Sequence, residues 1–171
     1  MNHLFQKIAD SSGDSYKELP FVQEGRHELI QITAAKNFVS QKDGADIAIV
    51  EVVILKSNNE EVRGKEQKFM WKFDSDQDTK AGIIKSLCMA AYNVPAKDVD
   101  LDLVTASFTQ TSDKDAKPGA LVGQCIACTA TPAVSKKGNE YCKYFYEPVD
   151  PALLEQVPEL RKSFDLPSEI A

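Results

Sequence analysis

The residue types best suited to binding a ligand lie between Pro118 and Val149, in two stretches separated by SerLysLysGlyAsn at 135–139. Residues 121–134 are rich in Val, Ile, Thr and Cys, and residues 140–149 hold tyrosines and a phenylalanine, so the pattern predicts a β-hairpin. Lysines and aromatic rings on one hairpin suit a single-stranded nucleic acid, because phosphates attract cations and unstacked bases pack on flat apolar faces. The alternative is an ordinary hairpin with core rings and a solvated lysine turn.

The stretch 140–149 carries two sets of side chains that alternate along the chain. One set is Cys142, Tyr144 and Tyr146, and the other is Tyr141, Lys143 and Phe145. Because neighbouring side chains of a strand point to opposite faces, we expect one set to be exposed. Tyr141 beside Lys143 is the preferred stacking platform, where each stacked base contributes about 1–3 kcal/mol.

The segment Gln67–Phe73 has the same alternation, with aromatic rings that include Trp71 on one face and Lys68 and Lys72 on the other. Two roles are open for Trp71, the only tryptophan: packing in the core or stacking on bases. If Trp71 packs in the core, Lys68 and Lys72 face the nucleic acid. This segment is therefore expected to supply either rings or charges, but not both from one face.

Other chemistries find less support in the residue types. Four cysteines and two histidines could build a zinc site only by using nearly all of the thiols. Cys125 and Cys128 are spaced so that their side chains would point to opposite faces of a strand, and we interpret them as small buried hydrophobic residues. The chain has no phosphate-binding loop or dinucleotide-binding glycine motif, and His27 has no nucleophile near it in sequence. We therefore expect no catalysis, no metal and no cofactor.

The net charge of −6 is concentrated at the two ends of the chain. Residues 1–24 carry −2 and residues 147–171 carry −4, which leaves 16 basic and 16 acidic residues between them. A neutral central part can still present a basic face, but charge alone does not require nucleic-acid binding. Because the chain has no run of about 18 apolar residues and no signal-peptide layout at its start, we expect a cytoplasmic protein that does not bind a membrane.

Three strands are expected in the first half of the chain, at 26–38, 45–56 and 67–73. Turns at 41–44 and 58–61 separate them, and the glycine after Asp43 accepts a positive φ at little cost.

One amphipathic helix is expected after the third strand. Residues 74–79 supply N-cap side chains, and Pro95 ends the helix. Its apolar stripe consists of Ile83, Ile84, Leu87, Cys88 and Ala91. Residues 98–108 fit no single pattern, and residues 109–120 have the composition of a loop.

Three strands, one helix and a two-strand hairpin are the elements of the oligonucleotide/oligosaccharide-binding (OB) barrel, in that order. We therefore predict a mainly β protein, an OB-like five-stranded Greek-key barrel whose helix lies between the third and fourth strands. The barrel covers residues 25–149. An N-terminal extension at 1–24 precedes it, and an acidic C-terminal helix or tail at 150–171 follows.

Several sequence segments in this domain share a pattern with one family. They are GlyArgHisGluLeuIleGlnIle at 25–32, ValGluValValIleLeu at 50–55, and above all AlaLeuValGlyGlnCysIleAlaCys at 120–128 followed by LysLysGlyAsnGluTyr at 136–141. The chain thereby resembles the phage-type single-stranded DNA-binding proteins of replication and recombination modules, in which a strand opening with Leu-x-Gly leads to a strand beginning near Gly-x-x-Tyr.

The resemblance implies sequence-independent binding of single-stranded DNA in phage DNA replication and recombination, in the cytoplasm of a bacterial host cell and without catalysis. Basic and aromatic residues on the matching strands are the DNA-binding candidates that it implies. They are Lys36, Phe38, Lys68, Trp71, Lys72, Lys136, Lys137, Tyr141, Lys143, Tyr144 and Tyr146.

The C-terminus departs from the family pattern. Many such proteins end in a dense acidic run with a hydrophobic tip, whereas Arg161, Lys162 and prolines dilute the acidic residues here. Docking of replication or recombination proteins and competition with DNA both stay open for residues 147–171. The alternative function is a non-catalytic β-barrel assembly module whose aromatic hairpin is a subunit interface in a homo-oligomer.

Overall fold

The computed structural model describes residues 18–110 and 117–167. Most of the expected extension at 1–24, half of the expected loop at 109–120 and the last residues of the expected tail at 150–171 lie outside the described residues.

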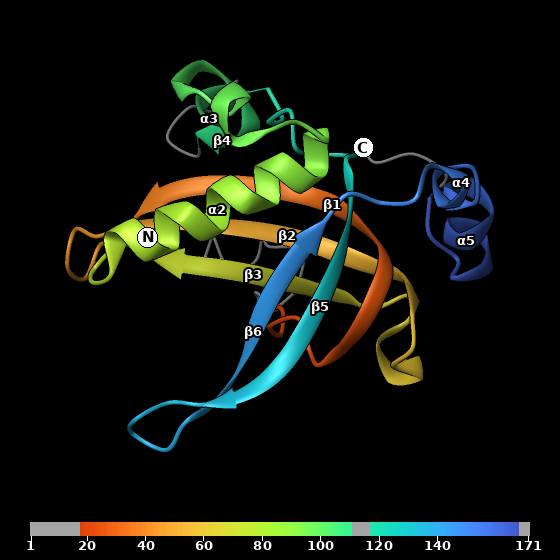
Figure 1. Cartoon of the computed structure of the whole chain (residues 1–171), viewed down its shortest axis with the longest axis horizontal. Helices are drawn as coiled ribbons and strands as arrows, with labels where there is room; N and C mark the ends of the chain where they lie inside the picture. The colour runs from red at the N-terminus through yellow and green to blue at the C-terminus, as the bar shows by residue number, and fades with distance from the viewer. Residues whose placement is uncertain (1–17, 111–116, 168–171) are drawn as a thin grey trace, which may run out of the picture.

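The described elements follow the expected order of three strands, a helix and a hairpin, with further short elements between them (Figure 1). They are β1 Gly25–Val39, β2 Asp46–Ser57, η1 Glu60–Val62, β3 Glu66–Lys72, α2 Gln77–Tyr92, η2 Ala96–Asp98, α3 Leu101–Ser107, β4 Thr109–Gln110, β5 Cys125–Val134, β6 Glu140–Glu147, α4 Pro151–Leu154 and α5 Val157–Ser163.

Five of the strands form one antiparallel sheet in the order β3-β2-β1-β5-β6, and the short β4 pairs parallel with β1. The predicted mainly β class is confirmed. Closure differs from the prediction: no ladder joins β3 to β6 within residues 18–110 and 117–167, so the sheet is open between these strands. Aromatic side chains bridge the opening, because the Phe69 ring on β3 lies 4.8 Å from that of Tyr144 on β6.

Residues 20–23 account for the missing ladder, because they lie along the free edge of β3. The Lys68 N–H donates to the Pro20 carbonyl at 2.9 Å, and the Val22 N–H donates to the Lys68 carbonyl at 3.0 Å. The Val22 side chain is only 1% exposed. Tyr144 on β6 donates its hydroxyl to the Val22 carbonyl at 2.7 Å, so this segment links the two edge strands.

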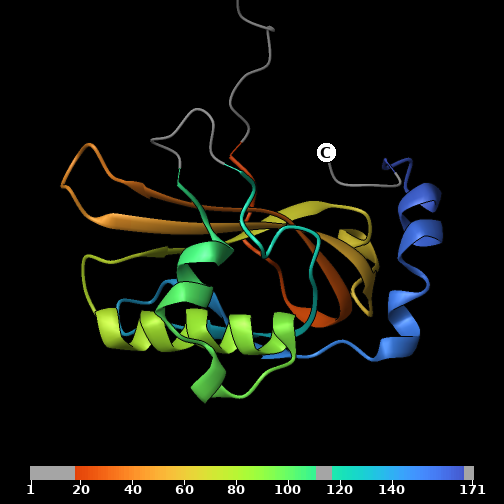
Figure 2. The same ribbon diagram turned by 90° about the horizontal axis from the view of Figure 1, so that it is seen from above.

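The helix α2 lies across the concave side of the curved sheet (Figure 2). Four of its residues are buried, and they join the strands in one large core cluster. They are Ile84, Leu87, Cys88 and Ala90. The helix ends at Tyr92, where Asn93 takes a left-handed conformation with φ 52°, and Pro95 prevents its continuation.

The turns at the ends of the two long hairpins each contain a glycine at positive φ, which the sequence predicts for the glycine after Asp43. Gly44 between β1 and β2 has φ +73°, and Gly138 between β5 and β6 has φ +84°. Both hairpin loops lie at the same end of the molecule in the two views (Figures 1 and 2).

The C-terminal helices α4 and α5 pack on the outer side of the sheet. Asp150 caps α4 by accepting a hydrogen bond from the Ala152 N–H at 3.0 Å, and Pro151 is the first residue of this helix. Leu153 of α4 and Val157 and Leu160 of α5 pack on a second buried cluster of Leu29, Val53 and Leu55. One part of the outer sheet face is therefore covered by this unit, and the part near Lys36 and Lys72 is not covered by it.

Candidate nucleic-acid interface

The outer face of β6 presents three exposed side chains in a row. Tyr141 is 46% exposed and Phe145 is 63% exposed, with the exposed Lys143 between them. Their partners across the ladder to β5 are the small residues Ala133, Thr131 and Thr129. Because these neighbours are short, the two rings and the ammonium group stand clear of the sheet. We call Tyr141, Lys143 and Phe145 the hairpin row.

Cations extend the hairpin row at the turn. Lys136 and Lys137 are exposed in the turn between β5 and β6. Among residues 18–110 and 117–167, no carboxylate or other side chain pairs with the ammonium groups of Lys136, Lys137 or Lys143. Glu140 is the one exposed carboxylate beside them on the described hairpin tip, so positive charge prevails at this end.

Arg26 closes the other end of the hairpin row. From β1 its Nη1 donates to Thr129 Oγ1 on β5 at 3.0 Å and to Glu147 Oε1 on β6 at 2.9 Å. The Arg26 side chain is half-exposed and stretches across β5. Arg26 therefore neutralises Glu147, the carboxylate at this end of the row.

A second group of candidates lies on the outer face of β1, β2 and β3. Lys36 stands opposite Ile49 and Met70, Phe38 stands opposite Ile47 and Lys72, and Lys68 stands opposite Glu51 in the strand register. The structure thus brings Lys36, Phe38, Lys68 and Lys72 to one face of the sheet.

The cations of this sheet face are all paired with carboxylates. Lys36 lies 3.9 Å from Glu51, and Lys68 lies 3.0 Å from Glu18. Lys68 is also 4% exposed and its ammonium lies over the Phe21 ring, 5.1 Å from the centroid. A phosphate would have to displace a carboxylate at each of these lysines.

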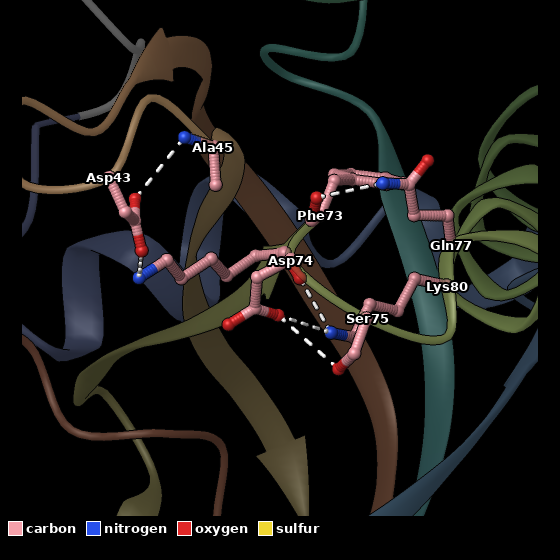
Figure 3. Close-up of polar contacts among 8 residues, drawn as sticks. Asp43, Ala45, Phe73, Asp74, Ser75, Gln77 and Lys80 are labelled. Carbon is pink, nitrogen blue, oxygen red and sulfur yellow. Dashed lines mark hydrogen bonds and ion pairs between the residues drawn. The ribbon is translucent and has the colours of Figure 1, made fainter.

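The third pair of this face joins Lys72 to Asp43, a residue of the loop between β1 and β2 (Figure 3). The hydrogen bond between them lowers the pKa of Asp43 and raises the pKa of Lys72. Asp74 next to this pair bonds Lys80 at 3.2 Å, and Lys80 also donates to the Lys72 carbonyl at 2.5 Å. The end of β3 is therefore a charge network rather than a set of free cations.

The remaining candidates lie in the core. Trp71 is 8% exposed and stacks beside Phe69 at 6.1 Å between centroids. The rings of Tyr144 and Tyr146 pack against Phe69 edge to face, at 4.8 Å and 5.2 Å. These three rings have little or no free face for a base, so we do not include Trp71, Tyr144 and Tyr146 in the interface.

Phe145 is the ring that the family resemblance did not point to. The only signal for it in the sequence is its position in the alternation, two residues after Lys143 and four after Tyr141.

The thiols show no activation for chemistry. Burial raises the pKa of Cys128 to about 12 and that of Cys125 to about 11, so both stay protonated at neutral pH. Within the described ranges, His, Cys, Asp and Glu side chains form no group of three or more that could hold a metal ion.

The chain matches no protein-family model, and no curated protein is significantly similar to it in sequence. No helix in the described part of the chain is both long enough and apolar enough to cross a membrane.

Proposed function

We propose that this chain is an OB-fold protein that binds single-stranded DNA without sequence preference, through the hairpin row and the lysine turn. The observation that carries the proposal is the combination of two exposed rings, Tyr141 and Phe145, with the cations Lys136, Lys137 and Lys143 on one hairpin, which pair with no carboxylate of the described residues. Stacking rings take bases of any sequence, and cations take the phosphates.

The strand order supports the OB assignment. In an OB barrel the first strand pairs with both the second and the fourth, as β1 here pairs with β2 and β5, and a helix lies between the third and fourth long strands, as α2 does. The barrel then closes between the third and fifth long strands. In this chain residues 20–23 and the contact of Phe69 with Tyr144 occupy that place.

The outer face of β1, β2 and β3 is the second part of the proposed path, because OB proteins bind oligonucleotides across this face and the loops at its end. Lys36, Phe38 and Lys72 would join the binding only after the carboxylates of Glu51 and Asp43 are displaced. We therefore assign the larger share of the affinity to the hairpin row.

Charge favours DNA over the alternative of a subunit interface on the same hairpin. In a symmetric dimer the same patch faces itself, so Lys136, Lys137 and Lys143 would meet their own copies. Like charges that face each other across an interface are unfavourable. A polyanion has the opposite charge and removes this cost.

The biological setting that we propose is phage DNA replication or recombination in the cytoplasm of a bacterial host. Replication or recombination proteins are proposed partners of residues 150–171. Leu153, Val157 and Leu160 already pack on the cluster of Leu29, Val53 and Leu55, so a partner would bind the exposed side of α4 and α5, where Leu154 is 45% exposed.

Titration of a fluorescently labelled oligothymidine tests the function. At low salt the protein should raise the anisotropy of the single strand much more than that of a duplex of equal length. The logarithm of the binding constant should fall with the logarithm of salt concentration with a slope of roughly −2, about −0.7 for each of three phosphates. The absence of any salt-sensitive response to the single strand overturns the proposal, and a concentration-dependent oligomer without DNA would favour the assembly module.

A further inference from the structure

The hairpin row has a fixed spacing. Tyr141 and Phe145 lie four residues apart on β6, and both point to the outer face. A strand rises by about 3.3 Å per residue, so the two rings stand roughly 13 Å apart. The rings lie along one regular strand that is paired with β5 over its whole length, so their separation is held by the ladder.

This spacing suits an extended strand. Neighbouring bases of one strand in a duplex rise by about 3.4 Å, so a strand stretched to about twice that rise places every second base at a separation of roughly 13 Å. In a strand extended to this rise, the two rings can each stack on a base while the base between them points elsewhere.

Lys143 occupies the midpoint of the same interval. It lies two residues from each ring on the same face, and its ladder partner is Thr131. A phosphate between the two stacked bases would pass over this position, where an ammonium group and a hydroxyl can both bind it. Further cations lie beyond both rings: Lys136 and Lys137 could bind phosphates beyond Tyr141, and Arg26 lies beyond Phe145.

We propose that β6 fixes the spacing of the bases that an extended single strand stacks on it. The rings of Tyr141 and Phe145 stack on bases n and n+2, and Lys143 binds the phosphate between them. This inference rests on the proposed function, but it adds a spacing that DNA binding by itself does not require.

Two oligonucleotides of equal length, with the same numbers of thymidines and abasic sites, test the spacing. The alternating oligonucleotide has a thymidine at every second position. The blocked one has pairs of thymidines separated by pairs of abasic sites. In the alternating strand half of the registers place bases at n and n+2, whereas every register of the blocked strand fills only one ring.

If each stacked base strengthens binding by about 5-fold to 150-fold, the alternating oligonucleotide should bind between about 3-fold and 75-fold more tightly than the blocked one. Phe145→Leu, at an exposed position, should make the two affinities equal, because a single remaining ring stacks on one base whatever the spacing of the others. Phe21→Leu, which removes an exposed ring outside the hairpin row, should preserve the difference.

The outcomes distinguish a failure of the n and n+2 spacing from a failure of the proposed function. The n and n+2 spacing is overturned, and DNA binding is left intact, if a fully thymidine oligonucleotide binds tightly while the two spaced oligonucleotides bind with equal affinity. A difference that persists in Phe145→Leu also overturns it. Failure of the fully thymidine oligonucleotide to bind overturns the proposed function itself.

Discussion

The hydroxyl of Tyr144 on β6 donates a 2.7 Å hydrogen bond to the carbonyl oxygen of Val22, whose own N–H is bonded to Lys68 on β3. Two edge strands that do not pair with each other are thus joined through one short segment, and the Tyr144 ring packs on Phe69 beneath it. Tyr146, two residues along the same strand, has a buried hydroxyl without a hydrogen-bond partner in the part of the chain that the structure describes.

This difference between neighbouring tyrosines predicts opposite effects of the same substitution. Tyr144→Phe should lower the free energy of unfolding by about 0.5–1.5 kcal/mol, because it removes a hydrogen bond to the Val22 carbonyl. Tyr146→Phe should leave stability unchanged or raise it, since burying an unsatisfied hydroxyl costs free energy. Urea unfolding of both variants measures the difference, and equal destabilisation by the two substitutions would contradict this role of the Tyr144 hydroxyl.

Stability should also depend on the protonation of His27. Burial lowers the pKa of His27 below 6.5 and the charge of Arg26 lowers it further, while the hydrogen bond to the Gln23 carbonyl at 2.8 Å acts in the opposite direction. The unfolded chain therefore binds a proton at a higher pH than the folded chain does. The free energy of unfolding should fall as the pH drops below 6.5 and should level off below the folded pKa.

Urea unfolding at pH 7.5 and pH 5.5 measures this dependence. His27→Gln should flatten it between these two values, although the variant is expected to be less stable at both. The lowered pKa values of Asp43 and Asp74 act only near and below the ordinary carboxyl range, so they do not interfere in this window. An unchanged pH dependence in His27→Gln would show that another group is responsible.

Tryptophan fluorescence should be a poor reporter of DNA binding in the native chain. Trp71 is 8% exposed and lies on the core face of β3, so a bound base cannot stack on it. A Phe145→Trp variant in a Trp71→Phe background should lose a large part of its emission when oligothymidine is added. Strong quenching of Trp71 in the native chain would place the strand on a different surface.

Reversing the charge of the turn should weaken binding and reduce its salt dependence. Lys136→Glu combined with Lys137→Glu should make the slope of log K against log salt shallower by at least about 1.4, since two phosphate contacts are lost. The matched control is Lys85→Glu with Lys97→Glu, which changes two exposed lysines on α2 and η2 and none on the hairpin. Unchanged affinity in the turn variant would remove the turn from the site.

The sequence predicted the strands well because their residues alternate or are β-branched over long runs. It also separated the two sides of β6, since alternation alone assigns Tyr141 and Lys143 to one face and Tyr144 to the other. Alternation does not say which face is covered. That depends on the packing of α2 and of residues 20–23, which no local pattern encodes.

Other features could not be predicted from the sequence, each for a different physical reason. The helix α3 has only seven residues, and Leu101 in its first turn is 80% exposed, so no apolar stripe marks it. The ion pairs of Lys68 with Glu18 and of Lys72 with Asp43 join residues far apart in the chain. Sequence could place Lys68 and Lys72 on one face, but it could not show that their charges are already neutralised.

DNA binding by the hairpin row is tested most directly by comparing the wild-type chain with a Tyr141→Leu/Phe145→Leu variant in binding to labelled oligothymidine at low salt. Both positions are exposed, so the variant should keep the stability of the wild type, which urea unfolding checks. We expect salt-sensitive binding by the wild type and a loss of about 25-fold or more in the variant, because two stacked bases are lost. Equal affinity of the two proteins, or no binding by the wild type, would contradict this expectation.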